Sequence, residues 1–265
     1  MNVSTVRSDL LKEQEALDSV VSILKPKDWL QLTPSPRWSV ADQIAHLTYF
    51  DKAAITAITD PDAFQNLVSE LMSTISAAEE AEDYTLSSYR EMDCYELLGA
   101  WRKGRKELAE AAYSLSDEDR VIWYGPSMGS KSFLTARLME VWAHGQDIID
   151  AVQIERQDTD RLRHIAQLGF ITRSWSYINR GLEPSEVPVR VAIQSPSGEI
   201  WNFGPEDASN CISGTAKDFC LVTTQRRNIL DTTLQVQGDA ALEWMTIAQA
   251  FAGPATMGPN ASRND

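Results

Sequence analysis

The most constraining feature of this chain is a change in the spacing of its apolar residues at Pro184. Before this proline, apolar residues recur every three or four positions, which is typical of helices that bury one face. After it, they alternate along short segments, as they do in the strands of a half-buried sheet. The pattern therefore predicts an α+β protein, with a four-helix bundle followed by a smaller domain that contains a sheet.

The first part of the chain is predicted to hold its helices between loops that contain proline or glycine. Ser39 and Asp42 have the spacing of a capping box, which predicts that a helix begins there. A less regular pattern over residues 62–80 predicts one helix or a pair. The four main helices are expected over residues 7–25, 39–59, 94–114 and 132–152, and a further helix over residues 160–179.

The second part is predicted to be a small α+β domain followed by a disordered tail that begins at Gly253. Its strands are expected over residues 187–194, 199–203, 210–213 and 232–237, and its helices over residues 216–227 and 239–251. The sequence thus divides into a helical bundle, a connecting helix, the small domain and the tail, over residues 1–155, 156–184, 185–253 and 254–265.

Composition narrows the classes of function. The chain has 265 residues, of which 43% are hydrophobic, and a formal net charge of −14. This acidic excess argues against nucleic acid or an anionic membrane as the partner, because both bind clustered Lys and Arg. No apolar run approaches the length of a membrane span, and the N-terminus lacks the apolar core of a signal peptide. The cysteines have neither CxxC spacing nor an even count, which predicts reduced thiols in a cytoplasmic protein: Cys94, Cys211 and Cys220.

The residues that point to chemistry are two histidines and one glutamate. Glu140 and His144 are four positions apart in a predicted helix, so their side chains lie on one face. His46 lies in another predicted helix, at helical spacing from Phe50 and away from the polar strip. Two imidazoles and a carboxylate with an open fourth position form one of the ways in which catalytic zinc is held. The sequence therefore predicts a metal site made of His46, Glu140 and His144.

Other interpretations of these residues remain open at this point. A glutamate and a histidine at this spacing often form a solvated pair on a helix surface. His46 and His144 could equally be buried and hydrogen-bonded without a metal. His164, which lies among charged and polar residues, is expected at the surface and not as a ligand.

Four longer segments resemble a known family. RWSVADQIAHLTYFDKAA and WYGPSMGSKSFLTARLMEVWAHGQDIIDA resemble the mycothiol-dependent maleylpyruvate isomerase-like branch of the DinB-like superfamily. ISGTAKDFCLVTTQRR and LQVQGDAALEWMTIAQAFAG resemble the sterol-carrier-like domain that follows in that branch. The resemblance implies a DinB-like four-helix bundle and a small sterol-carrier-like α/β domain. It also implies the same metal ligands, which are a histidine of the second helix, His46, and the E-x-x-x-H of the fourth, Glu140 and His144.

The resemblance further implies a metal-dependent transferase or isomerase that uses a low-molecular-weight thiol. A divalent metal would hold the thiol as its thiolate, which attacks an electrophilic small molecule. Zinc suits the ligand set best, with nickel, iron and manganese as alternatives. The thiol could be mycothiol, glutathione, bacillithiol or none, and the sequence decides neither the substrate nor the oligomeric state. The rival functions are a zinc hydrolase with metal-bound hydroxide and a metal-dependent protein that binds a small molecule unchanged.

Residues outside the ligand set are candidates for binding the cofactor or the substrate. Trp123, Tyr124 and Met128 precede the fourth main helix and are expected to line the cofactor pocket. The resemblance favours a functional arginine in the segment TQRR, where Arg226 or Arg227 would bind a substrate carboxylate with both ends of its guanidinium. The alternative is that these arginines only complement the dipole of the helix before them.

Two further residues could support the metal ligands themselves. Arg137 lies about one turn before Glu140, and Asp147 lies about one turn after His144. Asp147 is a candidate to orient His144 through its second ring nitrogen. An ordinary pattern of charges along an exposed helix face is the competing interpretation.

Overall fold

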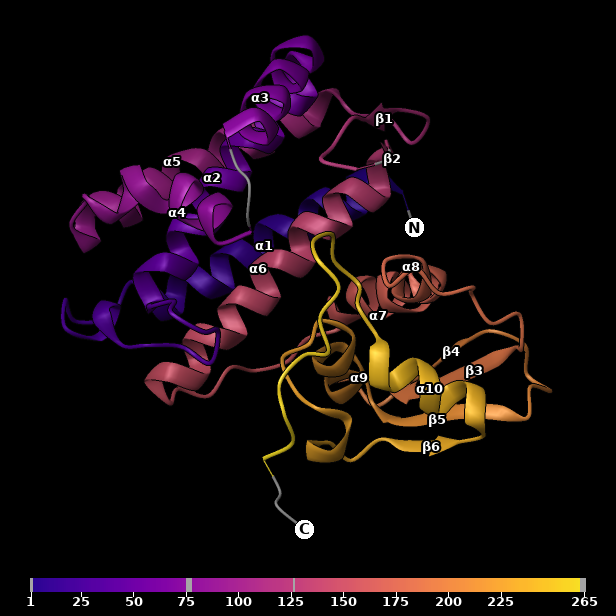
Figure 1. Cartoon of the computed structure of the whole chain (residues 1–265). Helices are drawn as coiled ribbons and strands as arrows, with labels where there is room; N and C mark the ends of the chain where they lie inside the picture. The colour runs from indigo at the N-terminus through magenta and orange to yellow at the C-terminus, as the bar shows by residue number, and fades with distance from the viewer. Residues whose placement is uncertain (1, 75–77, 126, 263–265) are drawn as a thin grey trace. The chain divides into compact units, whose positions relative to one another are not determined.

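The structure is a computed structural model that describes residues 2–74, 78–125 and 127–262 (Figure 1). The chain divides into two compact units, Met1–Arg156 and Gln157–Asp265. The first unit is helical apart from one short ribbon, and the second combines helices with a four-stranded sheet. This confirms the α+β class predicted from the sequence. In the part of the chain that the structure describes, no helix is both long enough and apolar enough to cross a membrane.

The first unit is built on four long helices, with α2 packed against α5 and α6, and α1 packed against α6 and α5. α2 begins at the predicted capping box, where the Ser39 hydroxyl accepts a hydrogen bond from the Asp42 amide and the Asp42 carboxylate accepts one from the Ser39 amide. Two more helices, α3 and α4, pack against α2. The helices are α1 Val3–Val21, α2 Val40–Thr59, α3 Pro61–Thr74, α4 Ala78–Arg90, α5 Cys94–Ala111 and α6 Ser130–Val152.

Two features of this unit differ from the sequence prediction or fall outside the description. The irregular pattern over residues 62–80 belongs to α3 and the start of α4, and residues 75–77 within it lie outside the described residues. The segment before α6, predicted as a loop, contains the antiparallel ribbon β1 Arg120–Val121 and β2 Met128–Gly129. Strands of two residues show no detectable alternation, so the sequence pattern does not reveal them.

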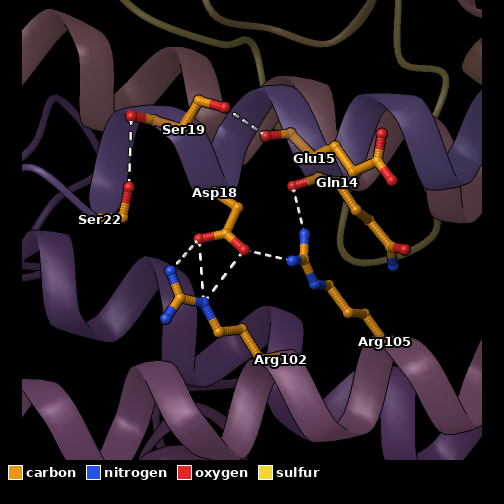
Figure 2. Close-up of polar contacts among 7 residues, drawn as sticks. All are labelled: Gln14, Glu15, Asp18, Ser19, Ser22, Arg102 and Arg105. Atoms are coloured by element: carbon orange, nitrogen blue, oxygen red, sulfur yellow. Dashed lines mark hydrogen bonds and ion pairs between the residues drawn. The ribbon is translucent and has the colours of Figure 1, made fainter.

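A polar cluster joins α1 to α5 at Asp18 (Figure 2). The Arg102 guanidinium donates to both carboxylate oxygens of Asp18 through Nε, at 3.1 Å each, and to Oδ1 through Nη2 at 2.6 Å. Arg105 pairs with Oδ2 of the same carboxylate and donates from Nη1 to the Gln14 carbonyl at 2.8 Å. One carboxylate thus accepts from two arginines, so less side-chain conformational entropy is lost than in two separate ion pairs.

Replacing Asp18 with asparagine is expected to lower the free energy of unfolding by about 1–2 kcal/mol, because two arginines lose a charged acceptor. Urea unfolding at neutral pH measures this change through the transition midpoint. Glu107→Gln is the matched control, since among the described residues Glu107 forms just the exposed 3.8 Å pair with Lys103 on α5. This substitution should change stability by less than about 0.5 kcal/mol. Equal effects of the two substitutions would contradict a bridging role for Asp18.

The second unit is built around a sheet with the strand order β4-β3-β5-β6. β3 pairs antiparallel with β4 and parallel with β5, and β5 pairs antiparallel with β6. Alternate residues of β3 are buried, namely Val189, Val191 and Ile193, as the sequence pattern predicts. The elements are α7 Leu162–Ile171, α8 Arg173–Ile178, β3 Val189–Gln194, β4 Ile200–Phe203, β5 Asn210–Thr215, α9 Ala216–Thr223, β6 Gln235–Gln237 and α10 Asp239–Ile247.

The helix predicted over residues 160–179 is two helices that meet at Thr172. The Thr172 hydroxyl donates to the Leu168 carbonyl at 2.8 Å, and its backbone, at φ −87° and ψ 11°, leaves the helical region. His164 lies on α7 and is only 3% exposed, so the prediction of a surface histidine is wrong. The reason is that α7 also buries Leu162 and Ile165 on either side of His164.

The tail beyond Gly253 contains no helix or strand as far as Ser262, yet it is hydrogen-bonded to the second unit. Gln225 donates to the Thr256 carbonyl at 2.8 Å, and Asp231 accepts from the Ser262 amide at 2.8 Å. Polar side chains of the unit thus supply hydrogen-bond partners to the tail, and the disorder expected there stays a prediction. Residues 263–265 lie outside the described residues.

Candidate metal centre

Three candidate ligands converge where α2 packs against α6. His46 comes from α2, and Glu140 and His144 come from α6, with one ligand atom of each within 4.8 Å of the others. Oε2 of Glu140 lies 3.0 Å from Nε2 of His144 and 3.5 Å from Nε2 of His46. Two ligand atoms bound at about 2.0–2.1 Å to one tetrahedral zinc ion lie about 3.3 Å apart, so these separations fit a shared ion.

The cluster is enclosed by aromatic rings but remains accessible. The exposed fraction of the side chain is 18% for His46, 17% for Glu140 and 9% for His144. The Trp38 ring lies 5.1 Å from the His46 ring and 5.8 Å from the His144 ring, measured between centroids. The Phe50 ring lies 4.5 Å from that of His46. Apolar rings around polar groups lower the local dielectric, which strengthens the electrostatic interactions of the cluster.

Glu140 carries a negative charge at the centre of the cluster. Burial disfavours the ionised carboxylate, but hydrogen bonds from His144 and His46, together with the nearby charge of Arg137, outweigh it and hold the pKa of Glu140 well below its usual value. A cation placed between the three side chains would therefore meet an ionised carboxylate at neutral pH.

Gln43 orients His144, a role for which the sequence suggested Asp147. The Thr33 hydroxyl donates to the Trp38 carbonyl at 2.9 Å and accepts from Nε2 of Gln43 at 2.8 Å. The remaining amide oxygen of Gln43 contacts Nδ1 of His144, which must then carry its proton there. Nε2 of His144, which lies 3.0 Å from Oε2 of Glu140, is then the nitrogen that would lose its proton and offer its lone pair to a metal ion.

Asp147 contacts Ser35 in the structure, and whether it also orients His144 stays a prediction. Its carboxylate accepts a hydrogen bond from the Ser35 hydroxyl at 3.0 Å. The signal for Gln43 was present in the sequence, since Gln43 precedes His46 by three positions and shares its face of the helix. A buried glutamine has no chemistry of its own, however, so spacing alone does not single it out.

Replacing Gln43 with leucine is expected to weaken zinc binding by about 10- to 100-fold, because the His144 ring loses the acceptor that fixes its orientation. Competition with a zinc-chelating dye measures the affinity. Thr48→Val is the matched control, since the buried Thr48 hydroxyl donates to the Ile44 carbonyl of its own helix at 2.7 Å. Unchanged zinc affinity in the leucine variant would contradict the orienting role.

Two of the three candidates for the cofactor pocket, Trp123 and Tyr124, lie near Phe50, whose ring contacts His46. Trp123 is buried, and its ring stacks on that of Phe64 at 5.3 Å between centroids. Tyr124 is half-buried beside Phe50, with ring centroids 5.6 Å apart. Met128 is half-buried in β2. Whether these three residues contact a cofactor stays a prediction.

Arg226 and Arg227 belong to the second unit, just beyond the end of α9. Nη1 of Arg226 donates to the Thr224 carbonyl, and Nη1 of Arg227 donates to the Arg226 carbonyl, each at 2.7 Å. The Thr224 carbonyl lies at the end of the helix and the Arg226 carbonyl lies beyond it, so the dipole interpretation also stays untested. Binding of a substrate carboxylate by either arginine stays a prediction.

The fold and the cluster together define a helical-bundle protein with a candidate metal centre, joined to a small α+β unit. The chain belongs to the mycothiol maleylpyruvate isomerase family, because the profile of the Mycothiol maleylpyruvate isomerase N-terminal domain matches residues 10–149. This bears out the family resemblance drawn from the sequence. At family level, its relatives include enzymes that use a thiol.

Sequence relatives extend along nearly the whole chain. Uncharacterized proteins from two strains of Mycobacterium tuberculosis are each 42% identical to it over 249 residues, which cover 93% of this chain and 95% of the relative. Crystal structures of the mycothiol-dependent maleylpyruvate isomerase and of a mutant of it match with a TM-score of 0.56 at 16% identity, covering 85% of this chain and 90% of theirs. At that identity the structural likeness shows the fold alone.

Proposed function

We propose that the protein is a metal-dependent enzyme that uses a low-molecular-weight thiol. It either isomerises an electrophilic small molecule with the help of the thiol or transfers the thiol to it. The observation that carries the proposal is the convergence of His46, Glu140 and His144 within 4.8 Å. Membership in a family named for a mycothiol-dependent isomerase supports the choice of a thiol. The substrate of the named enzyme, maleylpyruvate, is the first compound to test.

The residues of the cluster would divide the work between them. His46, Glu140 and His144 would hold the ion, with zinc as the best match for two imidazoles and a carboxylate. Gln43 would keep the His144 ring in the binding orientation. When bound, such an ion lowers the pKa of a thiol enough to keep it as a thiolate near neutral pH.

The proposed step needs no redox partner. The thiolate adds to one carbon of a conjugated double bond, and the electron pair of that bond moves to the conjugated carbonyl oxygen. Rotation about the new single bond and expulsion of the thiolate then give the other geometric isomer and regenerate the thiol. If protonation at carbon comes first, the product is a thioether, which is the transferase outcome.

A turnover assay with maleylpyruvate tests the proposal. The zinc-loaded protein is expected to need mycothiol or glutathione, and Glu140→Gln is expected to lose the reaction because the charged ligand is gone. Glu107→Gln, an exposed change on α5, should retain it. Consumption of an ester or amide substrate without any thiol would support the rival zinc hydrolase, which uses the same kinds of ligand. Absence of thiol-dependent turnover with every conjugated electrophile tried would contradict the proposal.

A further inference from the structure

Arg137 is a buried cation whose charge helps to keep Glu140 ionised, but this influence does not account for its unpartnered Nε. It lies on α6, three positions before Glu140 and therefore on the same face, and it is only 6% exposed. Its Nε is buried and has no hydrogen-bond partner among the described residues. Burying a polar group without a partner costs free energy, and a guanidinium costs more than a neutral group. A partner that arrives with a ligand would remove this cost.

Aromatic rings hold the guanidinium next to the metal ligands. The central carbon of the Arg137 guanidinium lies 4.9 Å from the ring centroid of Trp123 and 5.9 Å from that of Phe50. These cation–π contacts fix the position of the group without using its N–H donors. Phe50 also lies 4.5 Å from His46, so the same ring borders both the guanidinium and the candidate metal site.

Tyr124 supplies a second donor beside these rings. Its ring lies 4.9 Å from that of Trp123 and 5.6 Å from that of Phe50. Its hydroxyl is buried beside the Tyr49 side chain, with which it interacts. A guanidinium whose Nε lacks an acceptor among the described residues and a hydroxyl near the same two rings are suited to an anionic oxygen ligand.

Two carboxylates within the described parts of the chain interact electrostatically with Arg137, but neither accepts a hydrogen bond from it. The positive charge of Arg137 lowers the pKa of both Asp51 and Glu140 through space. Asp51 accepts a hydrogen bond from Gln14 at 3.5 Å, and Glu140 is engaged by the two histidines. Among the described residues, neither carboxylate is hydrogen-bonded to the guanidinium.

We propose that Arg137, assisted by Tyr124, binds a ligand carboxylate about one helical turn from the metal ligands and so determines specificity for anionic ligands. The location beside a reacting centre rests on the proposed function, whereas carboxylate binding itself does not. A bidentate guanidinium–carboxylate pair would hold a small molecule with its neighbouring carbons towards the metal. The carboxylate belongs either to the electrophilic substrate or to a thiol such as glutathione.

Calorimetric titration of the zinc-loaded full chain with unreactive probes tests the proposal without turnover. Maleate represents a substrate carboxylate, S-methylglutathione represents a thiol carboxylate, and dimethyl maleate is the uncharged control. Arg137→Gln is expected to weaken binding of one or both carboxylate probes by about 10- to 100-fold, and Tyr124→Phe by about 3- to 10-fold. The probe that is affected identifies the source of the carboxylate. Binding of dimethyl maleate should be weak and unchanged.

Control variants and zinc content separate the possible failures. Lys131→Gln removes a positive charge from the first turn of the same helix, where Lys131 is 3.9 Å from Asp117, and should alter binding less than about twofold. Three results would overturn the proposal. Wild type and Arg137→Gln could bind the carboxylate probes equally well, Lys131→Gln could lose as much affinity as Arg137→Gln, or wild type could bind neither carboxylate probe. If Arg137→Gln does not fold, the affinity of Tyr124→Phe for the carboxylate probes tests the proposal instead. Zinc measured in the same samples reports separately on the metal centre.

Discussion

Replacing His144 with alanine is expected to abolish stoichiometric metal binding while the protein stays folded. The substitution removes one of the two imidazoles that lie within 4.8 Å of the Glu140 carboxylate, and two ligands rarely hold zinc against dialysis. Because His144 lies on a helix that keeps its other packing contacts, circular dichroism should remain that of the wild type. Elemental analysis of the purified protein should give about one equivalent of zinc in the wild type and close to none in the variant.

His164→Gln provides the matched control for this experiment. His164 is also a buried histidine on a helix, but it lies in the second unit and outside the cluster of candidate ligands. The control should therefore retain the zinc content of the wild type. Full metal content in His144→Ala, or equal loss in both variants, would contradict the assignment of His46, Glu140 and His144 as the metal site.

Replacing Asp51 with asparagine is expected to stabilise the protein above neutral pH. Burial raises the pKa of Asp51 to about 7, although Arg137 and Arg105 act in the opposite direction. In the unfolded chain the same carboxyl has a pKa of about 3.9. Between these two values the folded state binds the additional proton, so the contribution of Asp51 to stability is lost as the pH rises from about 4 to about 7.

Urea unfolding of wild type and Asp51→Asn at pH 4.5 and pH 8 measures this effect. The stability of the variant relative to wild type should be about 2–4 kcal/mol greater at pH 8 than at pH 4.5, because asparagine remains neutral throughout. The difference between the two proteins removes the pH dependence that comes from the titratable groups they share. Glu107→Gln should show no such change, since Glu107 is half exposed. A difference between wild type and Asp51→Asn that is independent of pH would contradict a carboxyl that is protonated in the folded state.

Local sequence signals predicted the elements that carry the candidate site. The capping box at Ser39 and Asp42 sets the start of α2, and the apolar stripe around Glu140 and His144 defines α6. Both signals arise from contacts within one helix, so they can be read without knowing the rest of the fold. The convergence of His46 with the other two residues needed the additional premise that the two helices face each other, which the predicted four-helix bundle supplied and the family resemblance supported.

Contacts between distant segments could not be predicted in this way. The hydrogen bonds that link Thr33 and Gln43 to His144 depend on how a loop and two helices pack. The burial of His164 depends on the second unit as a whole. Arg137 resembles any arginine on a helix until the rings of Phe50 and Trp123 are seen around it. Such side chains gain their roles from the environment that the fold creates, and the sequence pattern does not contain it.

X-ray absorption at the zinc edge, recorded with and without thiol, tests the central claim most directly. For the zinc-loaded protein we expect nitrogen and oxygen ligands at about 2.0–2.1 Å, with imidazole scattering from two histidines. Addition of mycothiol or glutathione should introduce one sulfur ligand at about 2.3 Å. A spectrum without imidazole ligands would contradict the metal site, and a first shell unchanged by thiol would contradict a thiol-using centre.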